Sequence, residues 1–166
     1  MDATHLHLLL NHFPIIGTLI GTVLLIISLA TKNEAVQKAS LATIFLMALI
    51  AIPVFLTGEP AEERVEKLPG VVESMMEAHE EAAETAFWVM MVTGVISFVA
   101  LLLQFLQHQI AKTVVILALI ASLATSALMA RTGYLGGQIR HTEIRSDASG
   151  AQPDPAATGE EEEEEE

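Results

Sequence analysis

Four long apolar segments divide the chain, and polar residues gather between and beyond them. The segments are Leu8–Thr31, Ala39–Thr57, Ala86–Leu106 and Thr113–Ala130, and none of them contains Asp, Glu, Lys or Arg. Each is about as long as the ~20-residue helix that crosses the ~30 Å hydrocarbon core of a bilayer. A soluble bundle would need a polar stripe on every helix, which these segments do not supply. The pattern predicts an all-α integral membrane protein with four transmembrane helices.

Short connections determine how these helices run. Residues 32–38 join the first pair and residues 107–112 join the second pair. Connections of this length place consecutive helices side by side and antiparallel, which gives an up-down-up-down bundle. Both termini and the middle segment, residues 58–85, then lie on one side of the membrane. Lysines occur in both short connections, so the positive-inside rule predicts that the connections face the cytoplasm and the termini face outwards.

The third helix is predicted to continue beyond the bilayer. Gly58 and Pro60 are expected to end the second helix, Pro69 suits the first turn of a new helix, and the helical pattern then continues to Leu106. At ~100° per residue, His79 lies at the centre of an apolar stripe, and the glutamates of this stretch lie on the opposite arc. We therefore expect His79 to point into the bundle.

Composition divides the chain into two parts and excludes several functions. Residues 146–166 carry nine acidic residues and no basic ones, out of a formal net charge of −13. A like-charged segment of this kind repels itself and cannot bury a core, so we expect a disordered acidic tail after a transmembrane domain over residues 1–145.

The absence of cysteine excludes thiolate metal sites and iron–sulfur clusters. Scattered basic residues and few aromatic ones give no surface for nucleic acid.

Histidines gather on the side of the termini. Five of the six lie there, and His108, in the second short connection, is interpreted as an ordinary interfacial residue. His12 begins the first crossing, His79 lies on the third helix and His141 follows the fourth. Three helices are thus expected to bring one imidazole each to the same level of the bundle.

Several neutral imidazoles in a chain without thiolates suit haem b, whose iron takes two axial histidines from different helices of a bundle. We expect His12 and His79 to be the axial pair, because one lies on the first helix and the other points inward from the third. His7 and His141 are second choices, or ligands of a second haem. Zinc or copper, bound by the histidines and nearby glutamates, is an alternative.

A macrocycle also needs a close approach to the helices and partners for its propionates. Gly17 and Gly21 give the first helix a face without side chains, although the same spacing is a general device for packing membrane helices. Arg131 and Arg140 lie where propionates would reach the membrane surface. These four residues complete the predicted cofactor site.

Four short motifs, taken together, resemble those of an uncharacterised family of bacterial four-helix membrane proteins. The motifs are His7-Leu-Leu-Leu-Asn-His12-Phe-Pro14, Leu56-Thr-Gly-Glu-Pro60, Glu77-Ala-His79-Glu80 and Thr132-Gly-Tyr-Leu-Gly-Gly137. The resemblance covers nearly all of residues 5–145 and implies a haem-binding fold of the bacterial inner membrane, with His7, His12 and His79 as motif positions. His141 lies closer to the Gly-Gly pair than the corresponding histidine in many members.

The sequence thus predicts a membrane b-type cytochrome-like protein that binds haem near the outer face and transfers electrons. Its expected surroundings are the lipid bilayer and either other membrane redox subunits or an electron carrier. Two other interpretations stay open: a cofactor-free structural or assembly subunit, and a metal or proton carrier. The carrier is disfavoured because no crossing contains a charged residue. No nucleophile–base arrangement is visible, so an accessory or electron-transfer subunit is expected rather than an independent enzyme.

Overall fold

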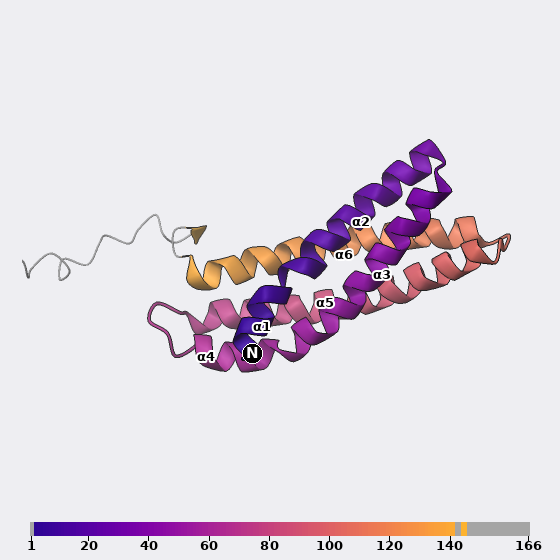
Figure 1. Ribbon diagram of the computed structural model, residues 1–166. Helices are drawn as coiled ribbons and strands as arrows, with labels where there is room; N and C mark the ends of the chain where they lie inside the picture. Colours follow the sequence, from indigo (N-terminus) through magenta and orange to yellow (C-terminus); the bar gives the residue numbers. More distant parts are fainter. Residues whose placement is uncertain (1, 142–143, 146–166) are drawn as a thin grey trace, which may run out of the picture.

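The computed structural model describes residues 2–141 and 144–145 as an assembly of α-helices, with no strand among them (Figure 1). The helices are α1 (Ala3–Leu10), α2 (His12–Thr31), α3 (Glu34–Leu56), α4 (Gly58–Val65), α5 (Glu73–Phe105) and α6 (Ala111–Arg140). Four segments are long and apolar enough to cross a membrane: Ala3–Thr31, Glu34–Leu56, Glu73–Phe105 and Ala111–Ile139. The predicted all-α membrane bundle is confirmed. The acidic tail expected over residues 146–166 lies outside the described residues.

Two helical hairpins, α2–α3 and α5–α6, make up the bundle. Their connections lie together at one end, and α1 and α4 lie at the other, as the up-down-up-down order requires (Figure 1). Around the bundle, α2 packs on α3, α3 on α5, α5 on α6, and α6 on α2. Each connection includes a non-glycine residue in the left-handed region, Lys32 with φ 55° and Gln107 with φ 50°.

The middle segment differs in detail from the prediction. Pro60 does not end the helical structure but lies in the first turn of α4, where its missing N–H costs no hydrogen bond. The long helix α5 begins at Glu73 rather than at Pro69, because Gly70 has φ 80° and Val72 is extended. The prediction that this helix is longer than a membrane crossing is confirmed.

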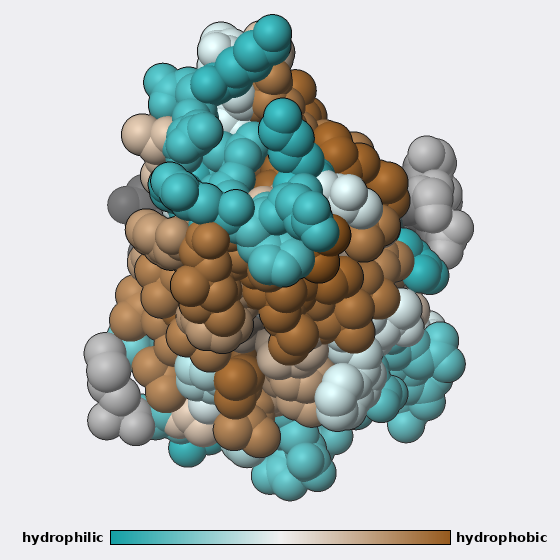
Figure 2. Space-filling view, turned by 90° about the vertical axis from the view of Figure 1, so that its right-hand side faces the viewer, coloured by the Kyte–Doolittle hydropathy of each residue, from teal (hydrophilic) through white to brown (hydrophobic). Residues whose placement is uncertain are grey.

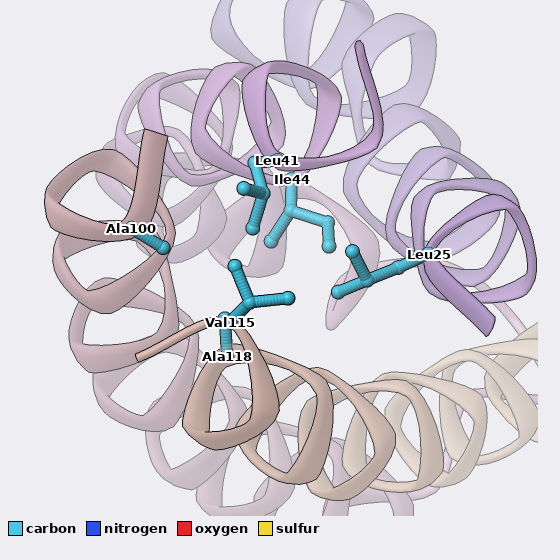
Figure 3. Packing of buried hydrophobic residues seen from close by; sticks show 6 residues of the cluster. All are labelled: Leu25, Leu41, Ile44, Ala100, Val115 and Ala118. Atoms are coloured by element: carbon cyan, nitrogen blue, oxygen red, sulfur yellow. The ribbon is translucent and has the colours of Figure 1, made fainter. Parts of the chain in front are cut away.

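A tightly packed apolar layer joins all four long helices near the short connections (Figure 3). Its buried members are Leu25, Leu41, Ile44, Ala100, Val115 and Ala118. A second layer, closer to α1 and α4, contains Met47, Ala48, Ala51, Ala86, Met90 and Met129. Because lipid tails are as apolar as these side chains, close packing rather than exclusion from water holds such layers together in a membrane.

Hydroxyl groups between the layers connect the helices to one another. Three contacts cross between helices: Thr18 Oγ1 to Met90 Sδ (3.6 Å), Thr22 Oγ1 to Ser126 Oγ (3.3 Å) and Thr93 Oγ1 to Thr125 Oγ1 (2.8 Å). Polar groups inside a membrane must find partners within the protein. The two hairpins are therefore joined by polar contacts as well as by packing.

Glycines on α2 serve this packing, and this corrects one expectation. A Cβ at Gly21 would come within 2.7 Å of Ile44 Cγ1, and a Cβ at Gly17 would overlap the side chain of Met47. Side chains of α3 therefore fill the face that Gly17 and Gly21 were expected to offer to a macrocycle. The general helix-packing role explains these two glycines.

The surface of the bundle is that of a membrane protein. Figure 2, which looks at the end that carries the short connections, shows hydrophobic residues across the middle and hydrophilic ones gathered towards the top and bottom. Large apolar side chains are exposed along every long helix, among them Leu19, Leu49, Val95 and Ile120. Such a surface is stable against lipid and not against water.

The close approach of α3 and α5 gives a test of this packing. Gly94→Ala should destabilise the protein by about 1–3 kcal/mol, because the new Cβ would overlap the Cβ of Ala48, which cannot turn aside. The measurement is the free energy of unfolding in mixed detergent–SDS micelles. Gly133→Ala is the control, since its new Cβ meets only the end of the Ile15 side chain, at 3.2 Å. Equal stabilities of the two variants would contradict the packing.

Candidate functional site

A short turn at Asn11 separates α1 from α2 and lets α1 pack against α3 and α4. This places His7, on α1, beside the end of α3. The His7 Nδ1 lies 3.0 Å from the carbonyl oxygen of Val54 and 3.4 Å from Thr57 Oγ1. Its ring also faces Gly58, where an added Cβ would lie 3.8 Å from Cε1. His7 is therefore held against the α3–α4 junction.

His79, on α5, is held in the same way against α6. Its Nδ1 lies 3.0 Å from the carbonyl oxygen of Thr132. A Cβ added at Gly136 would come within 2.9 Å of the His79 Cε1 and 3.1 Å of its Nδ1. The imidazole thus lies directly on the glycine backbone, and the prediction that His79 points into the bundle agrees with this placement.

The two hydrogen bonds determine which nitrogen of each ring is available. A carbonyl oxygen only accepts, so the Nδ1 atom of each ring carries the proton and donates it. The Nε2 atom of each neutral ring then keeps its lone pair. The two imidazoles are also close enough to interact electrostatically. One end of the bundle thus holds two neighbouring imidazoles, each with Nε2 as a possible ligand atom.

The other predicted ligands lie elsewhere. The side chain of His12 is exposed at the start of α2, so the structure brings His7 rather than His12 towards His79. Helical spacing explains part of this, because at ~100° per residue two positions five residues apart lie on different faces of a helix. His141 is exposed after the end of α6, and His108 lies at the opposite end of the bundle, as expected.

The two arginines expected to meet propionates are only partly described. Arg131 is exposed on α6, directly before the residue whose carbonyl holds His79. Arg140 closes α6, but its side chain lies outside the described part of the structure. Arg145 has a structural role: it donates to the carbonyl oxygens of Gln138, Ile139 and Gly70 and so ties the end of α6 to the loop before α5.

A metal site of several ligands is not formed at this end. Among the described residues, no group of three or more His, Cys, Asp or Glu side chains is placed to hold a metal ion. The alternative of zinc or copper bound by histidines and glutamates therefore has no ligand set in the described part of the chain. A group that needs only two imidazoles is not excluded by this result.

Exposed aromatic residues indicate the depth of the histidine pair. Trp88 on α5 and Tyr134 on α6 are both more than half exposed, and such residues gather at the membrane–water interface. Glu84 is the last charged residue of α5 before its apolar stretch. His79 precedes Glu84 by just over one turn, so it lies on the polar side of the apolar stretch of α5.

Comparison with protein families identifies the family to which the chain belongs. The family described as "Predicted membrane protein (DUF2231)" matches residues 3–143. The chain belongs to this family. No curated protein and no solved structure matches it. Membership in DUF2231 supports a multi-pass membrane protein in a lipid bilayer, whereas haem, the inner membrane and the orientation of the termini stay predictions.

Sequence reasoning missed the groups that hold the two imidazoles in this DUF2231 protein. The carbonyls of Val54 and Thr132 leave no trace in a sequence, because every residue has a carbonyl. The glycines four residues later, Gly58 and Gly136, do leave one: they lie in the motifs at the ends of α3 and α6. Only the fold shows that each glycine faces a histidine.

Carboxylates surround the outer side of the histidine end. Burial raises the pKa of Glu62 on α4, and the charges of Glu80, Glu66, Glu59 and Glu77 raise it further. Glu62 of α4 thus lies near four other carboxylates, of which Glu66 also has the Lys67 ammonium 3.9 Å away. Ionised Glu62 opposes the packing of α4 on the bundle.

The raised pKa of Glu62 predicts a pH-dependent stability. The folded state binds this proton more tightly than the unfolded state, so stability falls as pH rises from the ordinary carboxyl pKa through the raised value. Glu62→Gln should therefore raise the melting temperature at pH 7, and the gain should vanish at a pH below the ordinary carboxyl range. Glu63→Gln, at an exposed position of the same helix, is the control. A gain from Glu62→Gln that is equal at both pH values would contradict the prediction.

Proposed function

We propose that this DUF2231 protein is a membrane b-type cytochrome that binds haem between His7 and His79 and transfers electrons. The observation that carries the proposal is the shared geometry of the two imidazoles. Each donates Nδ1–H to a backbone carbonyl at 3.0 Å, which leaves Nε2 as the ligand atom. The proposal replaces His12 with His7 in the axial pair and keeps His79.

The hydrogen bonds have the form that iron-binding histidines require. A ligating histidine almost always donates its other ring N–H to a carbonyl, carboxylate or water, which fixes the ring and makes the ligating nitrogen more basic. The two carbonyls here belong to different helices, α3 and α6, and the two histidines to α1 and α5. A haem clamped between them would therefore be held by all parts of the bundle.

The donor set also fits haem better than a bare metal ion. Two imidazoles satisfy the axial positions of a haem iron, whose other four ligands come from the macrocycle. A bare zinc or copper ion would need at least one further protein ligand, and the described residues supply no group of three. Small side chains line α5 just inside the pair, where Ala82 and Ala86 are buried.

The proposal favours electron transfer rather than catalysis, because His7 and His79 would both hold the haem iron. The haem would supply a one-electron couple, and with both imidazoles bound it would leave no place for a substrate on the iron. The chain's own groups would hold the imidazoles, exclude water from the inner side and offer the cation of Arg131 at the surface. A haem held before the apolar stretch of α5 would be near the membrane surface, where it could exchange electrons with a membrane redox subunit or an electron carrier.

Absorption spectroscopy of the detergent-purified protein tests the proposal. Wild type should show a sharp α-band after reduction with dithionite, as expected of low-spin haem b with two imidazole ligands. His79→Ala and His7→Ala should each abolish or strongly reduce that band, because either change removes an axial ligand.

The matched controls are the exposed histidines. His12→Ala and His108→Ala should leave the band unchanged, because both side chains are exposed and neither is a proposed ligand. A colourless wild type, even after expression with added haem, would exclude the proposal and favour a cofactor-free subunit. Loss of the band in His12→Ala alone would restore the pairing expected from the sequence.

A further inference from the structure

The two hairpins of the bundle match one another position by position. Lys32 and Gln107 are the left-handed residues that follow α2 and α5. Seven residues before each of them lies a fully buried residue of the apolar layer, Leu25 and Ala100. Fourteen residues before each lies a fully buried threonine, Thr18 and Thr93. The inward faces of α2 and α5 thus share one pattern, counted from equivalent turns.

The histidines and their carbonyls continue the match. His7 and Val54 are 47 residues apart, and His79 and Thr132 are 53 apart. The histidine and the carbonyl residue each lie three residues farther from the left-handed residue in the second hairpin than in the first, which is nearly one helical turn. Because both separations increase by the same number of residues, the second histidine again lies opposite a carbonyl. In both hairpins a glycine, Gly58 or Gly136, follows the carbonyl by four residues.

The contacts between helices have the same symmetry. A rotation about the bundle axis that exchanges α2 with α5 and α3 with α6 carries the α3–α5 contact onto the α6–α2 contact, and both contacts are present. Repeats related by an axis along the membrane normal occur in other membrane proteins. The two imidazoles then lie on opposite sides of this axis.

A glycine at the fourth position has a physical role in such a repeat. Side chains on a helix tilt towards its N-terminus, so the side chain of residue i+4 covers the carbonyl of residue i. A glycine at that position leaves the second lone pair of the carbonyl open to a group from another helix. The His79 ring lies in the space that a side chain at position 136 would fill.

We infer that the chain is a tandem repeat of two histidine-bearing hairpins, and that Gly136 is the positioning residue that lets His79 reach the carbonyl of Thr132. Gly58 is its counterpart for His7, with more room: an added Cβ would lie 3.8 Å from the ring there, against 2.9 Å at Gly136. The inference rests on the proposed function only for its ligand, one haem per chain on the repeat axis. The positioning of the imidazoles holds with or without haem.

Nitrogen NMR of the haem-free protein, labelled with ¹⁵N-histidine in detergent micelles, tests the positioning directly. In wild type, both His7 and His79 should show the neutral form with the proton on Nδ1. Gly136→Ala should remove this signature from His79 and leave that of His7 unchanged. Gly58→Ala should leave both signatures, because 3.8 Å is an ordinary contact.

The unchanged His7 signal also reports that the Gly136→Ala variant is folded, and Gly137→Ala is a second control on the same helix. A wild-type His79 signature in Gly136→Ala would overturn the inference. Loss of both histidine signatures would also overturn it, because the two positions would then not be independent repeats.

Haem titration of the same variants separates this inference from the proposed function. Gly136→Ala should weaken haem binding at least tenfold and Gly58→Ala should not, with one haem per chain in wild type. If wild type binds no haem while the NMR results hold, the proposed function fails and the positioning role stands. If wild type binds two haems, the single site on the repeat axis is wrong.

Discussion

The bilayer core offers no partner for a hydrogen-bonding group, and this constraint shapes every part of the molecule. Peptide groups must pair within helices, so each crossing of this chain is a helix. Hydroxyls in the interior pair with carbonyls of their own helix, as at Ser28 and Ser40, and some also pair across helices, between α5 and α6 and between α2 and the other hairpin. An imidazole near the membrane surface obeys the same rule, and both inward histidines meet it by donating to a backbone carbonyl.

The two carbonyls become available for different reasons. Val54 lies in the last turn of α3, where helix carbonyls lack intrahelical partners, so His7 and Thr57 both reach its oxygen. Thr132 lies inside α6, where its carbonyl is open only because Gly136 carries no side chain. The same hydrogen bond is thus formed once at a helix end and once over a glycine. Both arrangements leave the Nε2 atoms free, which is the chemical basis of the proposed haem site.

Packing and the histidine pair divide the bundle along its length. The end with the short connections is closed by an apolar layer from all four long helices (Figure 3). The middle contains methionines and hydroxyls, and glycines on α2 and α5 bring neighbouring helices into close contact. The opposite end contains α1, α4 and the carboxylates around Glu62, where burial and neighbouring charges raise the pKa of Glu62.

The sequence alone determined the crossings, their order and the inward direction of His79. Hydropathy and helical periodicity are local properties, and burial in lipid requires both, so these features could be read without a fold. The sequence could not show that His7 rather than His12 lies near His79. The position of His7 depends on the break at Asn11 and on the packing of α1 against α3 and α4. Nor could it show that Gly17 and Gly21 meet α3 while Gly136 meets an imidazole. A glycine looks the same in a sequence whatever it faces, and only tertiary structure decides which neighbour occupies the space that its missing side chain leaves.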